Sequence, residues 1–92
     1  IVLSSSFVKE LPAVFAHYVT AKFAVEGLVN WAAVQYPTVR QLVVRPPKLL
    51  TDQTNTTVGR QGAMAVEQVA ASIVRQICQP HQSQALQIME TF

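Results

Sequence analysis

The sequence predicts an α/β fold with the element order strand–helix–strand–helix–strand, which is about half of a doubly wound parallel sheet. Two observations predict it. Short runs rich in apolar residues, at 1–4, 40–44 and 84–90, have the length of strands. Longer segments at 14–35 and 63–78 carry apolar residues at helical spacing. Because no linker or repeat divides the chain, we expect residues 1–92 to form a single segment.

The first half of the chain contains a strand, a loop and a long helix. Residues 1–4 predict a buried strand that ends at three serines, and 7–13 predict a loop because they contain Pro12. The helix at 14–35 is apolar on nearly every face. This predicts that a sheet covers one side and a partner helix another, with Trp31 packed at the helix interface. Pro37 ends the helix.

The second half continues the alternation. Two prolines at 46–47 end the strand at 40–44, and the Thr-, Asn- and Gln-rich segment 48–61 predicts a loop. Pro80 closes the helix at 63–78. We expect the buried face of that helix to be a stripe of Val66, Val69, Ala70, Ile73 and Ile77.

The composition argues against several functions. The seven basic residues are scattered, which disfavours nucleic-acid binding. The single cysteine, Cys78, excludes an internal disulfide and a multi-cysteine metal site, and we expect it to be buried. No membrane span or signal peptide is visible, so we expect a cytoplasmic protein. Only 13% of residues are charged, against about 25% on average, so another segment or chain is expected to cover apolar surface.

Tyr18 and Lys22 are the strongest candidates for chemistry. They lie four residues apart on the predicted helix, which places both on one face. A phenol with its ordinary pKa of about 10 is a poor acid or base at neutral pH, and a nearby ammonium favours the phenolate. Ser5, after the first strand, offers a hydroxyl to the same carbonyl. Each feature also has an ordinary interpretation, because Tyr-x-x-x-Lys occurs by chance and serines end strands or cap helices.

Together these motifs resemble those of the short-chain dehydrogenase/reductase family. The segment 1–5, Ile-Val-Leu-Ser-Ser, resembles the strand that ends in the family's catalytic serine. The segment 18–22, Tyr-Val-Thr-Ala-Lys, matches its Tyr-x-x-x-Lys motif, and 46–52 and 66–74 resemble its Pro-Gly-x-x-x-Thr segment and a later helix. The resemblance covers most of the chain in the family's order. It implies a Rossmann-like fold, of which residues 1–92 would be the C-terminal catalytic half.

The resemblance implies reduction of a carbonyl, in a ketone or a β-keto thioester, with NADP or NAD as cofactor. Tyr18 would be the general acid, Lys22 would favour the phenolate and bind the nicotinamide ribose, and Ser5 would orient the substrate oxygen. Ser6 is the alternative to Ser5. The implied cofactor contacts are Tyr18, Lys22, Pro46 and Thr51, and the implied substrate contacts are Ser5, Ser6, Phe7 and His17. Beside its implied role, His17 has an ordinary interpretation as a partly exposed residue at the start of a helix.

Two departures from the family's pattern limit the chain. Pro47 stands where the family usually has glycine, so we expect a different loop near the nicotinamide. The glycine-rich fingerprint that binds the pyrophosphate is missing, since Gly59 and Gly62 follow a polar loop instead of a strand. We therefore expect the cofactor to need the N-terminal half of the fold, on the same polypeptide or on a companion chain.

Three functional hypotheses stay open. The first is the oxidoreductase. The second is a non-catalytic structural or interaction module that retains the reductase fold. The helix at 14–35 favours it, because the corresponding helix of the family often packs against a second subunit, which also predicts a homo-oligomer. Retention of Ser5, Tyr18 and Lys22 at working spacing argues against it. The third is a small helical binding protein, and it does not explain where the apolar strands would be buried.

Overall fold

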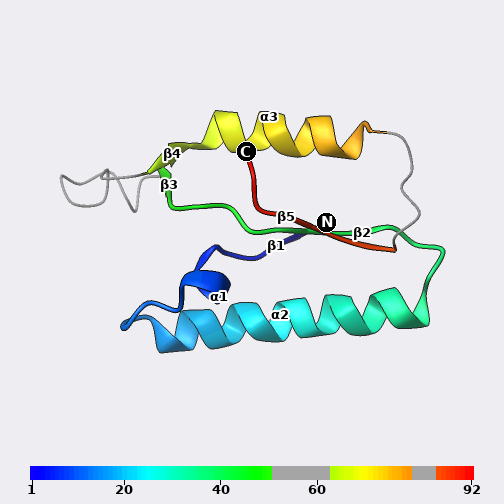
Figure 1. The fold of residues 1–92 in the computed structure, drawn as a ribbon, viewed down its shortest axis with the longest axis horizontal. Helices are drawn as coiled ribbons and strands as arrows, with labels where there is room; N and C mark the ends of the chain where they lie inside the picture. Colours follow the sequence, from blue (N-terminus) through cyan, green and yellow to red (C-terminus); the bar gives the residue numbers. More distant parts are fainter. Residues whose placement is uncertain (51–62, 80–84) are drawn as a thin grey trace.

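Three parallel strands form the sheet at the centre of the fold (Figure 1). This computed structural model describes residues 1–50, 63–79 and 85–92. The strands are β1 (Val2–Leu3), β2 (Gln41–Val44) and β5 (Leu86–Met89), in the order β1-β2-β5. In the register of the sheet, Val43 of β2 lies between Val2 and Ile88. The predicted α/β class, with helices between the strands of a parallel sheet, is confirmed.

β2 is the most buried strand. Leu42, Val43 and Val44 are all buried, and successive side chains of a strand point to opposite faces, so both faces of β2 are covered. Figure 1 shows how: α2 (Ala16–Gln35) lies on one side of the sheet, and α3 (Val66–Ile77) lies on the other. The uninterrupted apolar run in β2 is therefore what a central parallel strand requires.

Both long helices begin two or three residues later than predicted. α2 begins at Ala16 because Phe15 has a left-handed backbone, with φ of 67°, which interrupts a right-handed helix. α3 begins at Val66, not at 63, because β4 (Met64–Ala65) precedes it and pairs in parallel with β3 (Leu49–Leu50). The predicted loop at 48–61 thus contains β3, and its residues 51–61 lie outside the described residues.

The predicted loop at 7–13 contains a single helical turn, α1 (Phe7–Glu10), so that prediction was wrong. The carbonyl of Ser6 accepts hydrogen bonds from the N–H groups of Lys9 and Glu10. Leu11, with φ of 50°, ends the turn before the proline. Four residues are too few to show helical periodicity. The proline was therefore the clearest local signal, and it predicted a loop.

β1 is an edge strand and is largely exposed, contrary to the prediction of a buried strand. Leu3 is 56% exposed, and Ile1 is also exposed. Among the described residues, β1 pairs only with β2, so its other edge is open. Burial of a strand depends on neighbours on both sides, and the local sequence cannot specify that they are present.

Within the described part of the chain, α2 is covered on one side only. Its buried residues are Glu26 and Val29. Trp31 is half exposed and packs edge-on against Tyr36, so the interface predicted for it is not formed by the described part of the chain. The exposed large apolar side chains of α2 are Tyr18, Phe23, Val25, Leu28, Trp31 and Val34. The sheet therefore covers one face, as predicted, and the partner helix predicted for another face is not among the described elements.

The stripe predicted for α3 is correct only in part. Val69 is buried and Ile73 is half-buried, but Ser72 completes the buried line. The remaining members of the predicted stripe, Val66, Ala70 and Ile77, are exposed. A sheet of three strands is narrow, so it covers only one line of the helix. Cys78 is exposed at the end of α3, which corrects the prediction that it is buried.

We predict that the isolated chain self-associates through α2, because burial of its apolar side chains removes them from water. Leu28→Lys, at a position 65% exposed, should lower the mass measured by light scattering toward 10.1 kDa. Val74→Lys is the matched control on α3, at a position 57% exposed, and should leave the mass unchanged. A parent chain that is monomeric at high concentration would contradict the prediction.

Candidate active site

The carboxyl ends of the three parallel strands meet at one edge of the sheet. The residues that follow them are Ser4 after β1, Arg45 after β2 and Glu90 after β5. The backbone ties these ends together, since the N–H of Ser4 donates to the Val44 carbonyl at 2.7 Å and that of Arg45 to the Met89 carbonyl at 2.9 Å. This edge is where ligands bind in open α/β sheets, so it is the candidate site.

Ser5 lies at this edge with its hydroxyl anchored. It is 7% exposed, and its Oγ accepts a hydrogen bond of 3.1 Å from the N–H of Phe7 at the start of α1. Accepting this bond leaves the hydroxyl hydrogen of Ser5 available to a second partner. The one-turn helix α1 thus fixes the position of the serine oxygen without consuming its donor.

Tyr18 and Lys22 lie together on α2, as their spacing predicts. The Lys22 Nζ atom is 5.5 Å from the centroid of the Tyr18 ring, within the range of a cation–π contact. The same ammonium donates a hydrogen bond of 3.1 Å to the carbonyl of Leu3 in β1. Lys22 therefore connects the face of α2 that carries Tyr18 to the strand that leads into Ser5.

Phe7 links the serine segment to the tyrosine. Its ring packs edge-on against Tyr18, with centroids 6.1 Å apart, while its backbone N–H holds the Ser5 oxygen. Among the described residues, no hydrogen bond joins the hydroxyl of Tyr18 to that of Ser5. The structure thus brings Ser5, Phe7, Tyr18 and Lys22 into one chain of contacts.

The other predicted site residues have different placements. Ser6 is half-buried, and its N–H donates to the Pro46 carbonyl at 3.1 Å, so the serine segment and the turn after β2 are adjacent. His17 is exposed in the first turn of α2, which agrees with its ordinary interpretation. Thr51, predicted as a cofactor contact, lies outside the described residues, as does most of the predicted loop at 48–61.

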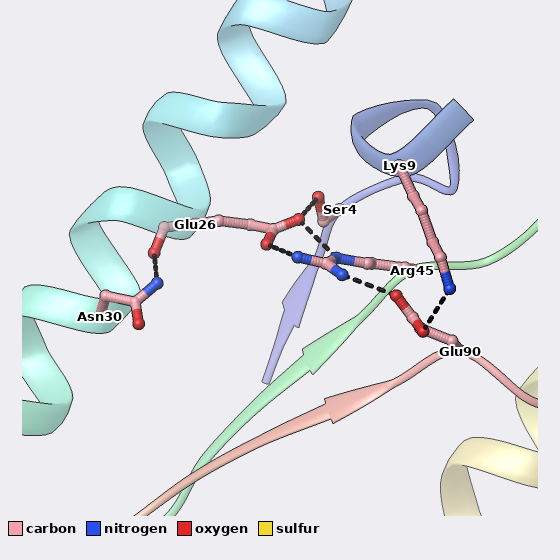
Figure 2. Close-up of polar contacts among 6 residues, drawn as sticks. All are labelled: Ser4, Lys9, Glu26, Asn30, Arg45 and Glu90. Carbon is pink, nitrogen blue, oxygen red and sulfur yellow. Dashed lines mark hydrogen bonds and ion pairs between the residues drawn. The ribbon is translucent and has the colours of Figure 1, made fainter. Parts of the chain in front are cut away.

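A network of charged side chains at this edge was missed by the sequence analysis (Figure 2). The carboxylate of Glu26 on α2 accepts two hydrogen bonds from Arg45, one of 3.0 Å from Nε and one of 2.6 Å from Nη2. Ser4 Oγ donates to the same carboxylate. On the outer side, Glu90 accepts from Arg45 Nη1 at 2.6 Å and from Lys9 Nζ at 3.4 Å. The network joins α1, α2 and the ends of all three strands.

The pKa shifts in this network favour the charged form of each group, because the pKa values of the two glutamates are lowered and that of the arginine is raised. The hydrogen bond from Arg45 lowers the pKa of Glu26, against the opposing effect of burial. The hydrogen bond to Glu26 raises the pKa of Arg45 above its usual value. Arg45 also lowers the pKa of Glu90. Glu26 is only 6% exposed, so its negative charge is held in the interior by these donors.

One sequence signal could have pointed to Glu26. The residues of α2 include only two charged side chains, Lys22 and Glu26, in a helix that is otherwise mostly apolar. They lie four residues apart, as do Tyr18 and Lys22, so all three share a face. The pairing with Arg45 could not be found in this way, because the two residues are 19 positions apart and on different elements.

A pocket of about 250 Å³ opens beside the network, and its walls carry both signs of charge. Ser6 and Pro47 contribute to it from the two adjacent strand ends, and the remaining lining residues are Lys9, Glu10, Arg45 and Glu90. The basic groups here are engaged with carboxylates. Ser6 thus faces a salt-bridged pocket, whereas Ser5 is tied to Phe7 and through it to Tyr18.

The chain matches no protein-family model, no curated protein and no solved structure. The resemblance to short-chain dehydrogenases/reductases therefore stays an expectation from the sequence motifs. Within the described ranges, no group of three or more His, Cys, Asp or Glu side chains could hold a metal ion. None of the described helices has the length and apolar character needed to cross a membrane.

We predict that the Glu26–Arg45 pair makes the fold acid-sensitive. A carboxyl whose folded pKa is lowered stabilises the fold above its unfolded value, here 4.5, and loses that contribution as pH falls through the folded value. The free energy of unfolding should therefore fall below about pH 5. Glu26→Gln should flatten this dependence in denaturant titrations, leaving the part due to Glu90, whose pKa moves in the same direction.

The control for this experiment is Glu10→Gln, at an exposed glutamate of α1. It should keep the pH dependence of the parent. Equal slopes for the parent and Glu26→Gln would mean that the buried ion pair is not the source of acid sensitivity.

Proposed function

We propose that the chain is the C-terminal catalytic half of a short-chain dehydrogenase/reductase with a Rossmann-like fold. It reduces the carbonyl of a ketone or a β-keto thioester with NADPH or NADH. The observation that carries the proposal is the arrangement of Tyr18 and Lys22 on α2 beside the carboxyl end of β1. Ser5 follows that strand and is connected to Tyr18 through Phe7.

Tyr18 acts as the proton donor. Its hydroxyl transfers a proton to the carbonyl oxygen as that oxygen gains negative charge, and the phenolate that remains is stabilised by the ammonium of Lys22. The Lys22 Nζ atom lies 5.5 Å from the ring of Tyr18, and its bond to Leu3 keeps it on that side of the helix. The hydride is supplied by the nicotinamide cofactor when it is bound.

Ser5 orients the substrate. Its oxygen is fixed by the N–H of Phe7, and its hydroxyl hydrogen can be donated to the carbonyl oxygen that Tyr18 protonates. The alternative, Ser6, has the more exposed side chain but lies on the pocket that contains Arg45 and Glu90. The connection through Phe7 to Tyr18 favours Ser5.

The nicotinamide end of the cofactor fits the described residues better than its nucleotide end. An ammonium has three donors, and the Leu3 carbonyl uses one, so two are left for ribose hydroxyls. Pro46 lies next to the serine segment and is suited to shaping the turn beneath the nicotinamide. For the pyrophosphate, the sequence offers no glycine-rich turn after a strand, and Thr51 is outside the described residues.

The nucleotide end would be bound by the N-terminal half of the same fold, on the same polypeptide or on a companion chain. The open edge of β1 and its exposed Leu3 support this, because they are suited to pairing with a further strand. The choice between NADP and NAD would belong to that half. The proposed small-molecule partner is the carbonyl substrate.

A non-catalytic interaction role is the second candidate function. It is favoured by the apolar side chains that α2 exposes, including Leu28 and Trp31. The same surface also fits the first proposal, since the enzyme could form a homo-oligomer through residues 14–35. The two candidates differ in whether the assembled protein reduces a carbonyl and needs Tyr18 to do so.

We predict that Tyr18→Phe abolishes carbonyl reduction in the enzyme assembled with its nucleotide-binding half. Loss of a general acid lowers the rate by about a hundredfold or more. The fold should be kept, because Phe preserves the ring that contacts Phe7. Cofactor oxidation measures the rate and circular dichroism the fold. Tyr36→Phe, at the other tyrosine, is the control and should retain activity.

We further predict that the two serines differ in their effect on turnover. Ser5→Ala removes the hydroxyl held by Phe7 and should lower kcat, because substrate orientation is lost. Ser6→Ala should leave kcat close to that of the parent. The opposite ranking in the same cofactor-oxidation assay would assign the role to Ser6.

A further inference from the structure

The partners of Glu26 come from two different strand ends, and each adjoins a proposed site residue. Ser4, which donates to the carboxylate, directly precedes Ser5. Arg45, which donates through Nε and Nη2, directly precedes Pro46. Figure 2 shows the Glu26 side chain reaching from α2 to both partners. One carboxylate therefore holds the beginnings of both site segments against the helix that carries Tyr18 and Lys22.

Stability alone is a poor explanation for this arrangement. Removing an ion pair from water costs free energy, and apolar side chains of similar volume at such a position are often as stabilising or more so. Apolar contacts are also non-directional, so they would let α2 slide or rotate on the sheet. A carboxylate that accepts a two-point bond from a guanidinium permits essentially one relative position of the two elements.

The bonds next to Glu26 transmit this position to the site. Ser6 N–H donates to the Pro46 carbonyl at 3.1 Å, which sets the serine segment against the turn after β2. Lys22, one turn before Glu26, donates to Leu3 at 3.1 Å. On the outer side, Arg45 is held by Glu90, which is itself paired with Lys9.

We propose that Glu26 is a positioning residue: through Ser4 and Arg45 it sets the serine segment and the Pro46 turn relative to Tyr18 and Lys22. This inference deepens the proposed function and rests on it for the meaning of those residues. Glu26 touches neither substrate nor cofactor in this role, so its effect on reduction is exerted through the geometry of its neighbours.

The main variant combines Glu26→Leu with Arg45→Met, which removes both charges and leaves neither buried and unpaired. Hydrogen exchange of the full chain, read by mass spectrometry with residue-level fragmentation, compares two N–H groups. The Ser6 N–H reports on the site, and the Gln41 N–H, bonded to the Ala85 carbonyl at 2.7 Å, reports on the opposite end of β2. We expect Ser6 to exchange about tenfold faster or more, with Gln41 unchanged.

Arg40→Met is the matched control. Arg40 is a half-buried arginine at the other end of β2, where its Nη2 donates to the Gln76 carbonyl at 3.1 Å and to Gln87 Oε1 at 2.9 Å. Its replacement should accelerate exchange at Gln41 and leave Ser6 as in the parent. If Glu26 only stabilised the fold, the double variant would instead accelerate hydrogen exchange at both N–H groups together, through global unfolding.

The inference is overturned if the double variant keeps the parent's ratio of Ser6 to Gln41 exchange. Should that variant fail to fold, Glu26→Gln is used instead, because it keeps the shape of the side chain. The same ratio of Ser6 to Gln41 exchange then decides. In the assembled reductase, the double variant should lower kcat about tenfold or more, and Arg40→Met should not. If the assembled parent reduces no carbonyl, the proposed function fails, while the exchange ratio still decides whether Glu26 positions these segments.

Discussion

The ion pair between Glu26 and Arg45 is the interaction on which the relation of α2 to the sheet depends. Glu26 is one of only two buried residues in a helix of 20, and Arg45 stands at the end of the most buried strand. Most of the remaining residues of α2 are small or apolar, and apolar contacts are non-directional. The paired hydrogen bonds between Glu26 and Arg45 are directional, and a buried charge cannot be left without its partner, so they favour one position of the helix on the sheet.

The candidate site follows from this constraint. With α2 held at the end of β2, the four-residue spacing along the helix places Lys22 against Leu3 and Tyr18 beyond it, toward α1. Phe7 then connects the ring of Tyr18 to the oxygen of Ser5. The contacts thus lead from the Glu26–Arg45 salt bridge, along one face of α2, to the residues Tyr18 and Ser5, which carry the two hydroxyl groups of the candidate site. The position of the five-residue motif 18–22 on the sheet thus depends on contacts with residues of other elements.

Much of the fold could be predicted from the sequence, and the errors have a common physical cause. Apolar runs predict strands and helical spacing predicts α2 and α3, because those patterns reflect local geometry. The single turn α1 and the pair β3–β4 were missed because two to four residues carry no periodicity. Burial was misjudged for Leu3 and Cys78, since exposure depends on which elements lie nearby.

By itself, the sequence determined that Tyr18 and Lys22 share a helical face, that a serine segment follows the first strand, and that three strands alternate with helices. These features depend on separations of a few residues, which the backbone geometry converts directly into positions. Only the tertiary structure decided that Ser4, Glu26, Arg45 and Glu90 meet, and that Phe7 joins Ser5 to Tyr18. Such contacts join residues on separate elements, and they arise only when the helix packs on the sheet.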